Sequence, residues 1–431
     1  MIINTGNHAP VACRQPRYGM HETPIMQKTI DKLIKLGFII RDSTSPWTSR
    51  ITLASKPHQE SVTEIEKYEW RFCINYIRLN MVTRPAEYPI PRCDDAVMYG
   101  FGTAQYFILL DAYLGYHQVR LTPESMAKTA FHAPNGRKYC WTVMPFGLKN
   151  CPPVYISMMH DLKDLWTEMA TAEGLDMSRN NGSTLIVDDT FIFAVGIEHI
   201  FLLVRCICLI SRKYHLTWKL KKAQWLPSKV EFVGVDLHRD GGNTPAESKD
   251  IILENWKIPS TPREAMGFIG FAIFYLRWCP WFEQTISPIR EAMSDFTLDH
   301  TFSAEQFPPP AIAAFHKVRR HILSKPILQR ANIEKRFYLK TDFSALGLGF
   351  ALCQPDDSDE SIAAMQREIS GGPCEFDFAV SKLRLLLVAL GSRRTKGSEI
   401  HFHSHPGEAL LQHAGASSRT AIFYGAANSA C

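Results

Sequence analysis

Runs of apolar residues that alternate with short polar segments predict a mixed α+β fold. The most informative run covers residues 185–193, where Asp188 and Asp189 lie between two stretches of aliphatic, β-branched and aromatic residues. This pattern is typical of two buried strands joined by a tight turn. A second apolar run, at 106–110, ends at Asp111 and predicts another buried strand closed by a carboxylate.

The same reasoning predicts the other elements of the chain. A Thr-Pro pair at Thr23 opens a helix that ends at Gly37, and a similar pair at Thr261 opens another helix. We expect further strands at 51–54, 70–76, 116–121, 128–131, 138–143 and 230–237. We expect further helices at 94–99, 152–169 and 198–214 and over most of 248–330, and new β structure from residue 337 to 352.

The adjacent carboxylates Asp188 and Asp189 need an explanation in a buried hairpin. Two like charges held close together are costly unless a cation neutralises them. An oxygen-preferring divalent ion such as Mg²⁺ is the natural partner. The alternative is a plain turn, because Asp favours turns in any case.

Composition describes a globular chain with an uneven charge distribution. The 431 residues are enough for two to four domains, with 45% hydrophobic and 21% charged residues. The net charge is only +5, yet residues 199–229 contain seven Lys or Arg and no acid, and a second basic run covers 317–340. Such patches suit a phosphate backbone, although an ordinary solvated face is the alternative.

Cysteine usage and the absence of targeting signals favour a location inside the cell. The eleven cysteines are scattered, with no Cys-x-x-Cys pair, which argues against a disulfide framework and a cysteine zinc site. No signal peptide opens the chain, and the longest apolar run, 265–276, is too short to span a bilayer. We therefore expect a cytoplasmic or nuclear protein without a membrane partner.

A series of short motifs follows the chain in order. They are Ser-Thr-Ser-Pro-Trp at 43–47, Trp70-Arg71, Leu79-Asn80, Tyr-Pro-Ile-Pro-Arg at 88–92, Leu110-Asp111, Gly-Tyr-His-Gln at 115–118, Lys-Thr-Ala-Phe at 128–131, Met-Pro-Phe-Gly-Leu at 144–148, Val-Asp-Asp at 187–189 and Val-Glu-Phe-Val-Gly at 230–234. Each motif alone is weak, but the ordered set is specific. From about residue 18 to residue 408 the chain resembles the reverse transcriptase of gypsy-type LTR retrotransposons.

This resemblance implies a right-hand polymerase of fingers, palm and thumb, followed by a connection and a partial RNase H-like α/β domain. We assign residues 1–240 to fingers and palm, 241–335 to thumb and connection, and 336–431 to a truncated RNase H-like domain with an unrelated tail. The implied activity is an RNA-directed DNA polymerase that extends a primer on an RNA or DNA template with deoxynucleoside triphosphates. The oligomeric state stays open.

The resemblance also implies roles for individual residues. Asp111, Asp188 and Asp189 resemble the catalytic carboxylates that hold two Mg²⁺, with Mn²⁺ as the alternative ion. Nucleotide contacts are implied for Arg71, Lys56, Tyr116, Phe146, Gly147 and Lys222. A primer grip, which positions the primer 3′ end, is implied for Phe232, Val233 and Gly234.

Each of these roles has a simpler alternative. Arg71 and Lys56, expected at the triphosphate, could be exposed hairpin charges, and Tyr116, expected to exclude a ribose 2′-hydroxyl, could be a core tyrosine. Phe146 and Gly147 could form a structural turn. Lys222, expected near the pyrophosphate, could be solvated or contact a phosphate backbone. For 232–234 the alternative is an ordinary strand.

The C-terminal part and one polymerase position depart from the family. Asp342 and Glu408 resemble the first two acidic positions of an RNase H domain, but residues 409–431 contain no acid. Two-metal hydrolysis usually needs more carboxylates, so we expect no RNase H activity. Ile186 replaces an aromatic residue that touches the primer-template, which would lower activity. The alternative function is a catalytically decayed remnant that only binds nucleic acid. The chain also resembles a fragment of a polyprotein or the translation of a decayed element.

Overall fold

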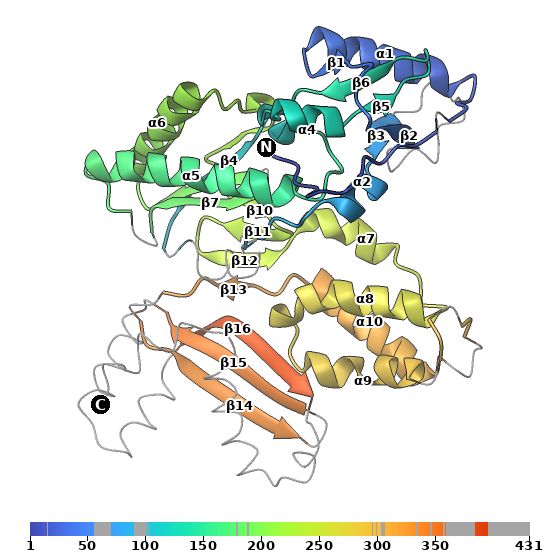
Figure 1. Ribbon diagram of the computed structural model, residues 1–431. Coiled ribbons are helices and arrows are strands. Elements are labelled where there is room, and N and C mark those ends of the chain that lie inside the picture. The colour runs from blue at the N-terminus through green and yellow to red at the C-terminus, as the bar shows by residue number, and fades with distance from the viewer. Residues whose placement is uncertain are drawn as a thin grey trace.

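The computed structural model describes most of the chain in detail. The described residues are 1–14, 16–55, 70–89, 101, 103–177, 180–187, 189–294, 296–298, 300–302, 307–332, 335–344, 347–356, 358 and 384–394. They form four sheets and the helices that pack on them (Figure 1). No helix in these ranges has the length and apolar character needed to cross a bilayer.

The N-terminal sheet has five strands in the order β1-β6-β5-β2-β3. Its strands are β1 Ile39–Arg41, β2 Ser49–Ser55, β3 Trp70–Asn75, β5 Phe131–His132 and β6 Lys138–Trp141. The short helices around it are α1 Glu22–Lys35, α2 Ile77–Val82 and α4 Pro123–Lys128. β5 and β6 form an antiparallel hairpin in which Gly136 of the connecting turn has φ +75°.

The central sheet has four strands in the order β7-β8-β4-β9. These strands are β4 Tyr106–Asp111, β7 Gly182–Ile186, β8 Asp189–Ala194 and β9 Gln224–Trp225. Its two long helices are α5 Cys151–Ala172 and α6 Ile197–Tyr214. The predicted strand-turn-strand at the carboxylate pair is therefore confirmed, with β7 and β8 as its arms.

Both faces of the central sheet are buried, which explains its continuous apolar runs. Ile108 and Ile192 belong to the core cluster that includes α5 and α6, whereas Phe107 and Phe191 belong to a second cluster with the helices further along the chain. Successive side chains of a strand point to opposite faces, so one strand supplies both clusters.

The third sheet spans the predicted boundary at residue 240. Its order is β10-β11-β12-β13, with β10 Lys229–Phe232, β11 Val235–His238, β12 Gly242–Pro245 and β13 Leu328–Gln329. The helices beside it are α7 Asp250–Glu254, α8 Pro262–Phe274, α9 Phe282–Met293 and α10 Pro309–Leu323 (Figure 1). The predicted cap of α8 is confirmed, because the Thr261 hydroxyl accepts a hydrogen bond from the Glu264 N–H.

The C-terminal sheet consists of β14 Tyr338–Ser344, β15 Gly347–Pro355 and β16 Leu385–Arg394. It lies beside α9 (Figure 1). Gly349 on β15 allows this approach, because a Cβ there would lie 2.4 Å from the Trp281 ring. Trp281 immediately precedes α9 and has φ +54°.

Four local predictions differ from the structure. Residues 116–121 do not form a strand, because Gly115–Gln118 is a short 3₁₀ helix. Residues 230–237 form a hairpin, not one strand. The first helix begins at Glu22 without a side-chain cap, so Thr23 lies inside it. Residues 128–130 follow or end α4, and the predicted helix at 94–99 lies outside the described residues.

Phe191 tests the core between the central and third sheets. Its ring is fully buried and packs against the rings of Phe107 and Phe232. We expect Phe191→Ala to lower the free energy of unfolding by about 3–5 kcal/mol in urea denaturation. Phe201→Ala, at a half-exposed position of α6, is the matched control and should change it by less than about 1 kcal/mol. Equal losses in the two variants would contradict this core.

Candidate active site

Asp111 and Asp189 lie opposite each other on neighbouring strands. They are cross-strand partners where β4 pairs with β8 in antiparallel register. Direct partners point to the same face, with Cβ atoms about 4.5–5.5 Å apart. Asp189 is exposed, and the Asp111 side chain is 27% exposed. The pair is thus open to solvent at one end of the sheet, and Asp188 lies outside the described residues.

The turn before Asp189 is conformationally demanding. Ile186 pairs directly with Asp189, which leaves two residues for the connection between β7 and β8. The first of them, Val187, has φ +52°. A β-branched residue in the left-handed region costs about 1–3 kcal/mol and persists only where surrounding structure holds it.

Lys222 forms an ion pair with Asp111. It belongs to a 3₁₀ turn, Leu220–Lys222, and its Nζ lies 3.5 Å from Asp111 Oδ2. The Lys219 N–H donates a hydrogen bond of 2.8 Å to the Asp111 carbonyl, which fixes the turn to the strand end. Because the lysine side chain is 62% exposed, the ion pair contributes only about 0–1 kcal/mol and can give way to another cation.

The donor chemistry of the pair fits a divalent metal ion. Asp111 and Asp189 offer only oxygen atoms, the ligands that Mg²⁺ prefers. Within the described ranges, no group of three or more His, Cys, Asp or Glu could hold a metal. The described part of the site therefore supplies two carboxylates.

Tyr116, which follows Asp111 by five residues along the chain, packs against Phe146. Their ring centroids are 5.1 Å apart, and the other side of Tyr116 meets the Tyr155 ring at 5.4 Å. Phe146 is 52% exposed. The sequence-based prediction named both residues, and the structure places them in one aromatic group that is partly open to solvent.

Gln118 joins the backbone at Tyr113 to the backbone at Thr217, and it was not assigned a role from the sequence. Its Nε2 donates to the carbonyls of Tyr113 and Thr217, at 2.7 and 3.1 Å, and its Oε1 accepts from the Thr217 N–H at 2.8 Å. The Gly-Tyr-His-Gln motif pointed to this position, but its partner at 217 is too distant in sequence to be predicted.

The loop with Gly147 is fixed by Asn80, a second residue without a predicted role. Gly147 has φ +91°, and its carbonyl accepts a 2.8 Å hydrogen bond from Asn80 Nδ2. Asn80 Oδ1 accepts another from the Lys149 N–H, also at 2.8 Å. A Cβ on Gly147 would lie 3.5 Å from the Ile74 carbonyl. The loop thus packs against the end of β3 with glycine backbone geometry.

The remaining predicted nucleotide contacts are less defined. Arg71 is exposed on β3 opposite Ala54, and no described contact joins it to Asp111. Lys56 lies outside the described residues.

The two predicted RNase H-like residues are only partly described. Asp342 belongs to β14, but its side chain is not among the described ones, and Glu408 lies outside the described residues.

The residues predicted to form the primer grip lie at the end of β10 and in the hairpin turn that follows it. Phe232 pairs with Val235, which leaves Val233 and Gly234 as a two-residue turn. Their φ values are +52° and +77°, as a type I′ turn requires. The Phe232 side chain is buried and stacks on Phe191 at 4.6 Å. The turn itself is therefore the accessible part of this motif.

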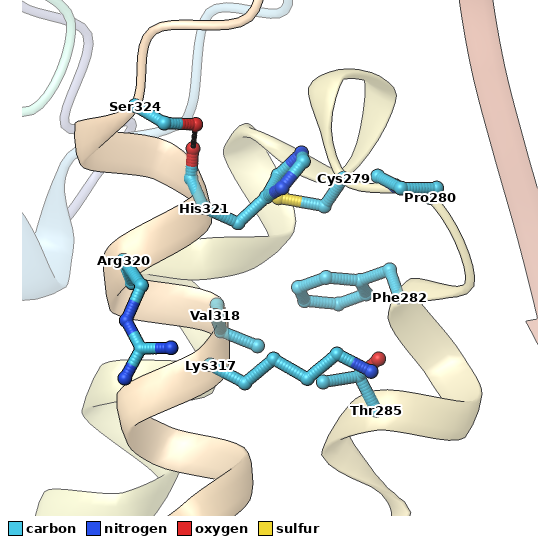
Figure 2. A pocket seen from close by; sticks show the side chains of 9 residues that line it. All are labelled: Cys279, Pro280, Phe282, Thr285, Lys317, Val318, Arg320, His321 and Ser324. Carbon is cyan, nitrogen blue, oxygen red and sulfur yellow. Dashed lines mark hydrogen bonds between the residues drawn. The ribbon is translucent and has the colours of Figure 1, made fainter.

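A separate cavity of about 240 Å³ lies between α9 and α10. Figure 2 shows Phe282 facing Val318 across it, with Lys317 extending toward Thr285 and Arg320 turned away. None of its lining residues belongs to the predicted site. The cavity is thus distinct from the carboxylate pair.

Two family models match the chain. The model of the reverse transcriptase (RNA-dependent DNA polymerase) matches residues 57–237, and that of the RNase H-like domain found in reverse transcriptase matches 307–375. The chain therefore carries a reverse transcriptase domain, followed by a region that matches an RNase H-like domain. This confirms the resemblance seen in the ordered motifs, and the second match begins before the predicted boundary at residue 336.

Curated relatives of this chain include longer polyproteins from Drosophila melanogaster. The retrovirus-related Pol polyprotein from transposon 297 is 29% identical over 355 residues, which cover 82% of this chain and 31% of that protein. The one from transposon gypsy is 27% identical over 362 residues, covering 82% and 33%. The chain spans about a third of the length of the curated relatives it matches.

Solved structures confirm the fold. The foamy viral protease-reverse transcriptase in complex with double-stranded DNA matches with a TM-score of 0.75 at 18% identity, covering 96% of this chain and 63% of that one. The same type of protein in complex with an RNA/DNA hybrid gives a TM-score of 0.69 at 19% identity, covering 96% and 48%. The predicted polymerase fold is therefore confirmed.

His117 gives the site region a pH-dependent stability. Its Nδ1 lies 3.0 Å from the Met144 carbonyl, its ring stacks on Trp141, and burial lowers its pKa. The folded protein thus binds this proton less readily than the unfolded chain, and stability falls as pH drops below about 6.5.

We therefore expect the stability advantage of the wild type over His117→Gln to shrink between pH 8 and pH 5. Urea denaturation at several pH values measures it. Glutamine can still donate to the carbonyl but does not titrate, so the difference reports the imidazole. An advantage that stays constant or grows toward acid pH would contradict the lowered pKa.

Proposed function

We propose that this reverse transcriptase is an RNA-directed DNA polymerase that adds deoxynucleotides to a primer 3′ end on an RNA or DNA template. The observation that carries the proposal is the cross-strand pair of Asp111 and Asp189 at an open strand end, with Lys222 at 3.5 Å. Paired carboxylates beside a displaceable lysine suit a site that receives metal-bound phosphates.

Asp111, Asp188 and Asp189 would hold two divalent ions, Mg²⁺ or Mn²⁺. Bound there, these ions supply activation of the primer hydroxyl and neutralisation of the triphosphate charge. The protein contributes the positions of the carboxylates through the register of β4 and β8. Lys222 would exchange its partner, from Asp111 to a phosphate oxygen of the nucleotide or leaving pyrophosphate.

The aromatic group around Tyr116 would select the sugar of the nucleotide. Tyr116 is held between Phe146 and Tyr155, so its ring cannot easily move away from a ribose 2′-hydroxyl. Gly147, fixed by Asn80, would allow backbone approach of the nucleotide, and Arg71 and Lys56 would contact the triphosphate. The turn at Val233 and Gly234 would support the primer end.

A nucleic-acid duplex is the proposed partner. The solved relatives were captured with double-stranded DNA and with an RNA/DNA hybrid. In this chain Lys221 and Lys222 are exposed on the 3₁₀ turn next to Asp111. This basic segment would attract the phosphate backbone, and binding would weaken with salt.

Asp111→Asn tests the catalytic assignment in primer extension on an RNA template with Mg²⁺. Losing one carboxylate of a metal clamp costs several kcal/mol of barrier, so we expect the rate to fall about a thousandfold. Asp161→Asn, at an exposed position of α5, is the matched control and should keep wild-type activity. Unchanged extension in Asp111→Asn would refute the site.

Binding and primer-extension assays of the wild-type protein distinguish the polymerase from the decayed remnant. Salt-sensitive binding of primer-template without any extension would show a remnant that only binds nucleic acid.

Tyr116→Ala tests the sugar selection. We expect the preference for deoxynucleotides over ribonucleotides, as the ratio of kcat/KM values, to fall by about tenfold or more, because space opens for the 2′-hydroxyl. Tyr116→Phe keeps the ring and should keep the preference. A preference that survives the alanine would assign Tyr116 to the core alone.

A further inference from the structure

The Val233–Gly234 turn is held by hydrogen bonds from two other segments, the residue after α8 and the residue after β12. The Gly234 carbonyl accepts two hydrogen bonds of 3.1 Å, one from the Ala246 N–H and one from the Tyr275 hydroxyl. Tyr275 follows the last residue of α8 and is 2% exposed. Burial raises the pKa of its hydroxyl, so the group stays protonated and donates.

The turn needs such support because of its backbone. Val233 has φ +52°, which a β-branched residue rarely adopts, and Gly234 has φ +77°. A Cβ on Gly234 would lie 3.5 Å from both the Tyr275 hydroxyl and the Phe274 ring. The end of α8 therefore packs directly against the turn.

The same turn is packed against the strand that carries Asp189. Phe232 stacks on Phe191, with ring centroids 4.6 Å apart and planes 30° apart. Phe191 lies two residues after Asp189 on β8 and is fully buried. A continuous path of contacts thus runs from Asp189 through Phe191 and Phe232 to the turn and on to Tyr275.

We propose that Tyr275 is a positioning residue for the primer: through the Gly234 carbonyl it sets where the turn holds the primer 3′ end relative to Asp111 and Asp189. The proposal rests on the proposed polymerase function. It differs from a purely structural role, in which Tyr275 would only attach α8 to the third sheet.

The chain offers a matched control for that structural role. Trp278 is also buried, and its Nε1–H donates a 3.2 Å hydrogen bond to the Asn243 carbonyl of β12. Trp278 therefore joins the same end of α8 to the same sheet, but away from the turn. Trp278→Phe loosens the attachment, whereas Tyr275→Phe removes only the hydroxyl that reaches Gly234.

The first measurement is single-turnover extension with saturating primer-template and nucleotide. In Tyr275→Phe we expect the maximal rate to fall about five- to tenfold, the effect of one hydrogen bond, with the Kd for primer-template changed less than about twofold. Trp278→Phe should lower the melting temperature more, yet keep the maximal rate within about twofold. Equal rate losses in both variants, or none in Tyr275→Phe, would overturn the proposal.

The second measurement does not depend on catalysis. A primer with 2-aminopurine at its 3′ end is bound to proteins that also carry Asp111→Asn. We expect Tyr275→Phe to shift the fluorescence of the terminal base toward that of free primer-template, and Trp278→Phe to leave it unchanged. An unchanged signal in Tyr275→Phe would refute the positioning role. Because this readout does not require extension, a wild type that extends no primer would refute the polymerase function alone.

Discussion

The antiparallel register of β4 and β8 is the constraint on which the site depends. It places Asp111 opposite Asp189 and, on the same two strands, Phe107 opposite Phe193. Because side chains alternate, a slip by one residue would separate the carboxylates and also move the aromatic residues to the face of α5 and α6. Burial on both faces therefore fixes the register of the two strands. The register in turn places both carboxylates at the open strand end.

Local patterns were sufficient to predict the strands that carry the carboxylates. The apolar run at 106–110 and the one around Asp189 each predict a buried strand from consecutive residues alone. No knowledge of a distant partner is needed to recognise them. The cap at Thr261 was predictable for the same reason, since its hydrogen bond is made within one helical turn.

Features that depend on distant partners were not predictable. The 3₁₀ helix at Tyr116 looked like an alternating strand, and its conformation follows from rings and amides supplied by residues 146, 155 and 217. The turn at Val233 was not predicted, because valine is not among the residues that indicate a turn with positive φ. Asn80 and Tyr275 act through contacts 67 and 41 residues away, which no local pattern encodes.

The contact of Trp281 with Gly349 has a consequence for how the C-terminal sheet is attached to the rest of the chain. Because the indole lies directly over the backbone of β15, the C-terminal sheet approaches α9 more closely than any side chain at 349 would allow. The attachment is not apolar alone, because the Glu283 N–H in the first turn of α9 donates a 3.2 Å hydrogen bond to Ser392 Oγ on β16. The C-terminal sheet is therefore attached to α9 at two points, and any side chain larger than hydrogen at 349 would push the sheet away from both.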